Sequence, residues 1–229
     1  MKREGKAANF AALKEILAPM TKKERLEYLW EYYKVVPIVA VVVIAFLASM
    51  ISSWLKPEIV FEGIGVNVDM IEDDDSYITE DWLQVMGGNA KKETARYSSL
   101  YIGSFEEDTV ETELAVAAQK VMLMAIAESL DYVLMDRSAV DFYIEKGIFS
   151  PLEKVLSEEQ LEQFQDKMIY VELEDNTKLP VALDISETSF AKQCSVVGKE
   201  LFIAFPGNTE RAELSDNFLD HLLAWKQAD

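Results

Sequence analysis

The residues whose types and positions could bind a small molecule are polar side chains at the ends of predicted strands. The members of this set are Ser104 and Glu106 after one strand, Asp136, Arg137 and Ser138 after the next, and Asp184, Ser186 and Glu187 after a third. Ligands of α/β folds bind outside the carboxyl ends of the strands, so these residues are the candidate ligand-binding set. Each has a structural alternative, since Ser138 and Ser186 could cap turns and Arg137 could pair with a neighbouring acid.

Metal and catalytic chemistry finds less support. His221 is the only histidine and is expected on the surface of the last helix beside its buried face, which leaves no zinc cluster and no histidine-based triad. Cys194 is expected in a strand as a small apolar filler. The acidic loop from Glu72 to Asp75, with Asp69, offers oxygen ligands for calcium but lacks the spacing and the glycine of an EF-hand, so a solvated loop is favoured. We therefore predict no metal, no cofactor and no catalytic residue.

An uncharged run of 21 residues, from Val35 to Leu55, precedes all of these candidates. A helix of that length spans about 30 Å, the thickness of a bilayer's hydrocarbon core. Lys34 and Lys56 bracket the run. Aromatic residues lie at both ends, with Trp30, Tyr32 and Tyr33 before it and Trp54 at its far end, as at membrane interfaces. We expect a transmembrane helix over residues 35–55; a cleaved signal peptide, which has a shorter apolar region near the N-terminus, is the alternative.

Charge predicts the orientation of this helix. Residues 1–34 contain eight lysines and arginines and five glutamates, a net charge of +3, whereas residues 56–229 contain 14 basic and 36 acidic residues, a net charge of -22. The positive-inside rule places the basic side in the cytoplasm and residues 56–229 outside the cell. A charge of -22 disfavours nucleic acid as a partner. The single cysteine excludes an intrachain disulfide. A domain outside the cell that lacks disulfides is typical of bacteria, which suggests a Gram-positive type of cell.

Residues 1–34 are predicted to form a cytoplasmic amphipathic leader. Apolar residues from Phe10 to Leu17 recur at helical spacing and stop before Pro19, and Thr21 with Glu24 forms a capping box for a second helix that can run into the span. This leader could seat the anchor at the membrane interface, or it could dock a partner. The sequence does not separate the two.

Residues 56–229 alternate apolar strands with capped helices, which predicts a single layered α/β domain with a mixed sheet. Strands are expected at 59–68, interrupted by Gly63 and Gly65, and at 97–105, 132–135, 168–173, 179–185, 193–197 and 201–205, with Gly198 and Lys199 as a hairpin turn between the last two. Helices are expected after Thr79, from Asp108 to Ser129, from Ser138 to Gly147, after Ser157, and after Asn208 or Thr209. The helix 108–129 is apolar on both sides, so we expect it to be covered on both.

Part of this succession resembles extracellular solute-binding proteins of the type 2 periplasmic-binding fold. The resemblance lies in Tyr101 to Ser104, the long helix, Leu130 to Asp136, the helix to Gly147, and Phe149 to Leu152, and again in Leu179 to Asp184 and Leu201 to Pro206 before the closing helix. It covers roughly residues 96–226. The longer members of that family have two lobes that close over a ligand, whereas this chain has little room for a second lobe.

These observations predict a single-pass protein of the cell membrane with its N-terminus in the cytoplasm and an extracellular binding or interaction module that has no chemistry of its own. Such a module would serve a transport, sensing or envelope assembly. Its partner would be a protein in the membrane or envelope or a small molecule, and the lack of a second lobe favours a protein. The alternative is an enzyme that acts on an envelope substrate through carboxylates.

Overall fold

The computed structural model describes residues 14, 17–33, 35–54, 56–103, 112–173, 175–207 and 211–225. Within those ranges it leaves out the side chains of several helical residues, among them Val36, Pro37 and Ser53. The chain divides into two compact units, Met1–Lys56 and Pro57–Asp229, which are described separately below.

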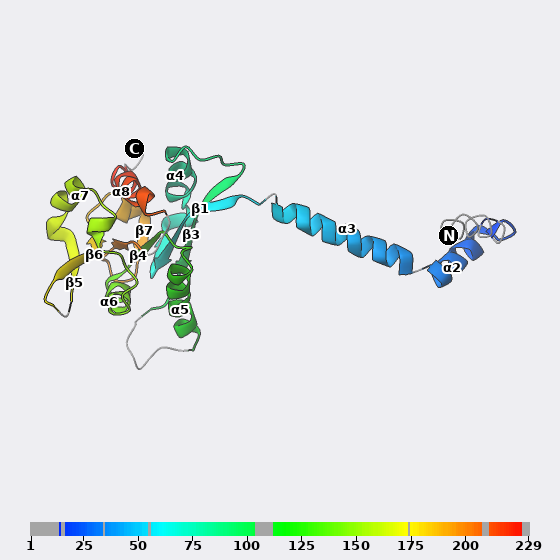
Figure 1. Cartoon of the computed structure of the whole chain (residues 1–229), viewed down its shortest axis with the longest axis horizontal. Helices are drawn as coiled ribbons and strands as arrows, with labels where there is room; N and C mark the ends of the chain where they lie inside the picture. Colours follow the sequence, from blue (N-terminus) through cyan, green and yellow to red (C-terminus); the bar gives the residue numbers. More distant parts are fainter. Residues whose placement is uncertain are drawn as a thin grey trace, which may run out of the picture. The chain divides into compact units, whose positions relative to one another are not determined.

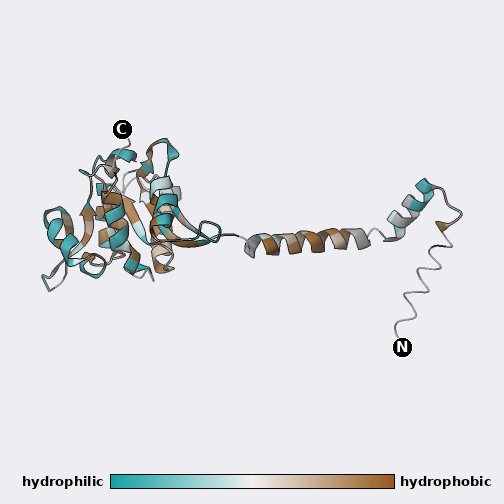
Figure 2. Ribbon diagram, turned by 90° about the horizontal axis from the view of Figure 1, so that it is seen from above, coloured by the Kyte–Doolittle hydropathy of each residue, from teal (hydrophilic) through white to brown (hydrophobic). Residues whose placement is uncertain are grey.

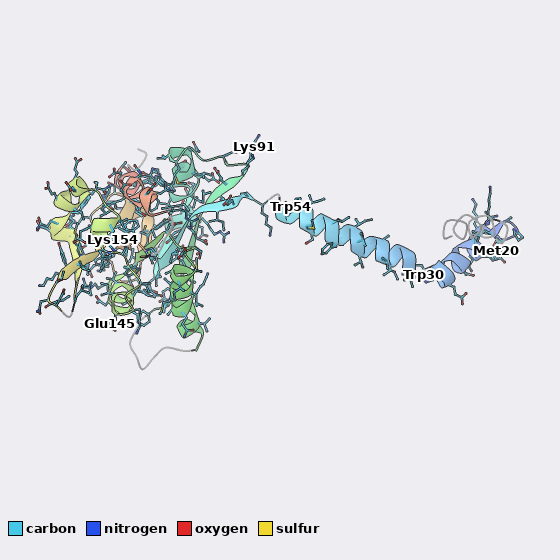
Figure 3. The ribbon with its side chains drawn as sticks, in the orientation of Figure 1. Met20, Trp30, Trp54, Lys91, Glu145 and Lys154 are labelled. Atoms are coloured by element: carbon cyan, nitrogen blue, oxygen red, sulfur yellow. The ribbon has the colours of Figure 1, made fainter. Side chains whose placement is uncertain are left out.

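The first unit contains two helices, α2 (Lys22–Tyr33) and α3 (Val35–Trp54). The predicted capping box of α2 is confirmed, because the Thr21 backbone N–H and hydroxyl both donate to a Glu24 carboxylate oxygen at 2.8 Å. Of the helix predicted from Phe10 to Leu17, most residues lie outside the described ones. Trp30 on α2 and Trp54 at the end of α3 are exposed (Figure 3).

Hydrophobic residues extend along α3 (Figure 2). Valine, isoleucine, leucine and phenylalanine side chains from Val35 to Ile51 are exposed by between 49% and 66% where they are described. Among the described residues, the structure contains no helix long and apolar enough to cross a membrane.

The second unit is an α/β structure built on a mixed six-stranded sheet in the order β3-β1-β4-β8-β6-β5. The strands are β1 (Glu58–Val66), β3 (Glu93–Leu100), β4 (Tyr132–Met135), β5 (Met168–Glu172), β6 (Lys178–Asp184) and β8 (Phe202–Ala204). β1 is parallel to β3 and β4, whereas β8 is antiparallel to β4 and β6, and β5 is antiparallel to β6. A separate ribbon pairs β2 (Val68–Met70) with β7 (Cys194–Val196).

Helices cover both faces of the sheet (Figure 1). One apolar core joins α4 (Glu80–Val85) and α8 (Ser215–Leu223) to Phe61, Tyr132 and Leu134. The other joins α5 (Thr112–Ile126) and α6 (Arg137–Glu145) to Ile64, Val66 and Val133. A further short helix, α7 (Glu158–Gln163), begins with the predicted Ser157–Gln160 capping box.

Several predicted boundaries are wrong. The first strand runs straight through Gly63 and Gly65 and ends before Asn67, whose backbone takes a φ of +58°. The two glycines make room for aromatic rings instead, because a Cβ at Gly63 would lie 1.9 Å from the Tyr132 ring and one at Gly65 would lie 1.9 Å from the Tyr97 hydroxyl. Strand β3 lies at 93–100 rather than at 97–105.

The predicted hairpin at Gly198 and Lys199 is also wrong. β7 pairs with β2, and β8 enters the main sheet between β4 and β6, so the two strands belong to different sheets. Among the side chains of α5 that the structure describes, 116–126, the fully buried ones are Ala118, Val121 and Ala125, which lie on one side. On its other side Val116, Leu123 and Ile126 are exposed, which corrects the expectation that the helix is covered on both sides.

Candidate functional site

The candidate site lies at the carboxyl ends of the parallel strands. The chain goes from β1 to β3 on one side and then crosses to β4 on the other, so the direction of winding changes between β1 and β4. In open α/β sheets this switch point is where a ligand crevice forms. The residues that follow β1 and β4 here are Asn67 and Asp136.

Asn67 is 2% exposed and joins the ends of three strands. Its amide Nδ2 donates to the Gly103 carbonyl oxygen at 2.8 Å and to Asp136 Oδ2 at 3.2 Å. Its Oδ1 accepts from the backbone N–H groups of Ile102 and Gly103, each at 2.8 Å. The backbone carbonyl of Asn67 also accepts from Val197 N–H at 3.2 Å. The side chain of Asn67 therefore occupies the switch point and satisfies its own polar atoms there.

Asp136 caps α6 from the other side of the switch point. It is 3% exposed, and its Oδ1 accepts from the Ala139 backbone N–H and from the Ser138 hydroxyl, both at 3.0 Å. The prediction that Ser138 begins this helix is thus wrong, because Asp136 is the N-cap and Ser138 only bonds to it. The predicted end of the helix at Gly147 is confirmed by its φ of +65°.

The third predicted group lies at the same edge. β6 is parallel to β4 because β8 is antiparallel to both, and Phe202 at the start of β8 is opposite both Met135 and Asp184. The Arg137 guanidinium carbon lies 5.7 Å from the centre of the Phe202 ring. The structure therefore brings the Asp136 group and the Asp184 group to one edge, on either side of Phe202.

The side chains of these groups are engaged in local contacts. The Ser186 hydroxyl donates to Asp184 Oδ1 at 2.5 Å and accepts from Leu201 N–H at 2.9 Å, which closes a turn. Arg137 pairs with Asp141 at 3.2 Å, and Glu187 pairs with Lys167 at 2.7 Å on the surface. Ser104 and Glu106 lie outside the described residues.

A small pocket of about 230 Å³ lies beside Asn67, between the end of β3 and the β2–β7 ribbon. Asp69 and Ser195 are opposite each other on that ribbon, and Ser99 and Tyr101 complete the polar lining. The Tyr101 ring is 73% exposed. A carboxylate, two hydroxyls and an exposed ring can hydrogen-bond and stack against a small hydroxylated molecule, but they include no pair of nucleophile and base.

Sequence reasoning missed the lining of this pocket and the role of Asn67. The signal for Asn67 was an asparagine after a long apolar strand, since asparagine tolerates the left-handed backbone better than other non-glycine residues. Ser195 carried no comparable signal. Its place opposite Asp69 depends on the pairing of β7 with β2, and the two residues are 126 positions apart in the sequence.

Cys194, His221 and the acidic loop, the other groups considered from the sequence, make contacts that support the fold or lie at the surface. Cys194 is a buried free thiol, and burial raises its pKa to about 12, which fits the predicted filler. His221 is not a plain surface residue, because its ring stacks on Tyr77 at 4.1 Å and its Nε2 donates to the Tyr77 carbonyl oxygen at 2.8 Å. Partial burial raises the pKa of Asp75 in the acidic loop, and in the described residues no cluster of three or more metal-ligating side chains occurs.

Comparisons of the chain with protein-family models, with curated proteins and with solved structures find no match.

Proposed function

We propose that the chain is a single-pass membrane protein in which α3 is the anchor, residues 1–34 are cytoplasmic and residues 56–229 are outside. The support comes from the sequence, in which Val35 to Leu55 is an uncharged run of 21 residues, long enough as a helix for about 30 Å, and from the exposed apolar side chains of α3; the described residues alone contain no helix that meets the requirement for a span. Burying such side chains in lipid removes them from water, at about 25 cal/mol for each Å². The excess of basic residues before α3 supports the orientation.

We further propose that the α/β unit is a binding or interaction module without chemistry of its own, related in fold to the solute-binding proteins, within a transport, sensing or envelope assembly. The observation that carries this proposal is the Asn67–Asp136 hydrogen bond at the switch point. A ligand in the usual crevice of an α/β sheet would have to displace a buried and fully bonded pair of side chains.

At this edge of the sheet, the size of the pocket beside Asn67 favours a protein as the partner. Its volume of about 230 Å³ is below the range of about 300–1,000 Å³ that is usual for small-molecule sites. The described residues of the second unit form one main sheet and one ribbon, with no second lobe among them. Protein contacts need neither a deep pocket nor a lobe that closes.

The topology can be tested by labelling with a membrane-impermeant maleimide on intact cells. Glu145→Cys and Lys154→Cys place thiols at exposed positions of the second unit (Figure 3), and Lys23→Cys places one in the leader. The wild-type chain is the control, because its single thiol is buried. We expect the first two variants to label on intact cells and the third only after lysis; the reverse pattern would overturn the proposed orientation.

The choice between a protein and a small ligand can be tested by thermal unfolding of the full chain in detergent with sugars, amino acids, peptides and divalent metals. A ligand at 100 times its dissociation constant adds about 2.7 kcal/mol of stability, which is a measurable shift. We expect no shift. A shift that disappears in Tyr101→Ala, with Tyr170→Ala as a matched exposed-tyrosine control, would establish a small-molecule site and refute the protein partner.

A further inference from the structure

Helix α5 has a second apolar face that nothing in the proposed function uses. Ala118, Val121 and Ala125 are buried against the sheet. On the other side Val116 is 62% exposed and Leu123 is 63% exposed, and Ile126 at the end of the helix is 67% exposed. Large apolar side chains gathered on one exposed helix face are typical of an interaction surface rather than of scattered surface residues.

The spacing along this face is that of a coiled-coil seam. Val116, Gln119, Leu123 and Ile126 are separated by three, four and three residues, which are the steps between the a and d positions of two heptads. All four are exposed. This stripe therefore fits a second helix laid along α5, with one polar residue, Gln119, in the seam.

An open groove of about 610 Å³ lies along the same helix. Leu100, at the end of the edge strand β3, is one of its lining residues. Among the residues that the structure describes, its lining contains no aspartate or glutamate, and Lys120 is the one charged residue. Residues 56–229 contain 36 acids among 174 residues, about one in five, so the described lining of this groove is poorer in acidic residues than the domain as a whole.

We propose that this face of α5 is where two copies of the chain associate, α5 packing against its counterpart around a two-fold axis. The a and d stripe is self-complementary, as an interface between identical copies requires. The charge of the groove also favours a second copy of the chain as the partner. A basic partner protein would bind best to a surface rich in acidic residues. Another copy of this acidic chain is repelled least at a surface that lacks acidic residues and contains a lysine.

Within this proposal the two α5 helices are parallel, and the two-fold axis runs along them. In a parallel pair Leu123 meets its counterpart and Gln119 meets its counterpart, and a polar residue at one seam position fixes the register. Confinement to a membrane also raises the effective concentration, which lets a seam of two heptads suffice.

This inference names the partner of the proposed interaction module and so rests on that proposal. The maleimide labelling above reports the topology independently, so a monomeric chain would overturn the pairing while leaving the topology result in place.

Disulfide crosslinking of the full-length chain in its own membrane tests the pairing. Gln119→Cys and Leu123→Cys place thiols in the seam, and Glu145→Cys, at the exposed end of α6, is the matched control. A disulfide needs Cα atoms within about 7 Å, so a parallel seam joins each thiol to the same residue of the other copy. We expect a band at twice the chain mass from the two seam variants under mild oxidation and none from the control. Equal yields from all three would overturn the proposal.

Leu123→Glu provides a second measurement that does not use cysteine. The side chain is exposed, so folding should tolerate the change, which unaltered thermal unfolding would verify. We expect the wild-type chain to have the mass of a dimer in mild detergent and this variant to have the mass of a monomer. A wild-type monomer, or a seam crosslink only to a protein of another mass, would refute association of two copies.

Discussion

Replacing Asn67 with alanine should destabilise the second unit more than almost any other polar substitution. The side chain makes three hydrogen bonds to backbone groups and one to the Asp136 carboxylate, all in a nearly water-free position. A neutral bond contributes about 1 kcal/mol and one to a charged group about 1.5–3 kcal/mol, and buried partners left without a bond cost more. Alanine must also keep the φ of +58°, which costs about 1 kcal/mol.

Together these effects predict a loss of about 6 kcal/mol for Asn67→Ala. Asn67→Gly removes the same hydrogen bonds without the backbone strain, so it should cost about 1 kcal/mol less. Asn176 is the matched control, because it has a φ of +63° but is exposed and its side chain makes no hydrogen bond to any described residue. Asn176→Ala should therefore show the strain alone, about 1 kcal/mol.

Urea unfolding of the full-length variants in detergent, followed by tryptophan fluorescence, measures these differences, because Trp82 lies in the core beside Phe61. The order expected is wild type, Asn176→Ala, Asn67→Gly and Asn67→Ala, from most to least stable. If Asn67→Ala cost no more than Asn176→Ala, the hydrogen bonds at the switch point would not hold the strand ends together, and Asn67 would not block a ligand from the crevice.

Three further changes test other parts of the second unit. Gly63→Ala should prevent stable folding, since its Cβ would overlap the Tyr132 ring, and Gly63→Ala with Tyr132→Leu should recover part of the urea midpoint. Asp131 is fully buried and accepts from Arg211 Nε at 2.9 Å, so Asp131→Asn should cost about 2 kcal/mol in urea unfolding, below the value for a fully buried pair because Arg211 is partly exposed. Burial raises the pKa of Cys194 to about 12 in the folded chain, so the thiol should resist alkylation at pH 8 until urea unfolds the protein. Because the folded pKa is higher than the unfolded one, the contribution of this thiol to stability is complete below pH 9 and is lost as the pH rises from 9 toward 12. A lower urea midpoint at pH 10 than at pH 8 would show this loss.

Sequence reasoning succeeded where the determining contacts are local. The Thr21–Glu24 and Ser157–Gln160 capping boxes, and the helix end at Gly147, depend on residues three or four positions apart. The buried strand Tyr132–Met135 was also predicted with its correct bounds, because four apolar residues between polar neighbours leave few alternatives.

It failed where a partner is distant in sequence. The turn residues Gly198 and Lys199 favoured a hairpin, but β7 pairs with β2 instead, and no residue near Gly198 indicates that pairing. The exposure of Val116 and Leu123 was missed for a similar reason. The sequence shows that a residue is apolar, but it does not show whether that residue packs against its own chain or against another molecule. For the candidate site, the strand-end rule found the right edge but not Asn67 or Tyr101, which depend on how the strand ends meet.

The position of β8 has a consequence for how the chain is made. Synthesis proceeds from the N-terminus, so β1, β3 and β4 emerge long before Phe202, and β5 and β6 follow as a separate hairpin. The two groups of strands have no direct pairing with each other and are joined through three residues near the end of the chain. Until Phe202 to Ala204 have been synthesised, β4 and β6 each have an unpaired strand edge in the nascent domain. Such edges can pair with a chaperone or with a neighbouring nascent chain. A chain truncated before Phe202 should for this reason be aggregation-prone rather than merely less stable.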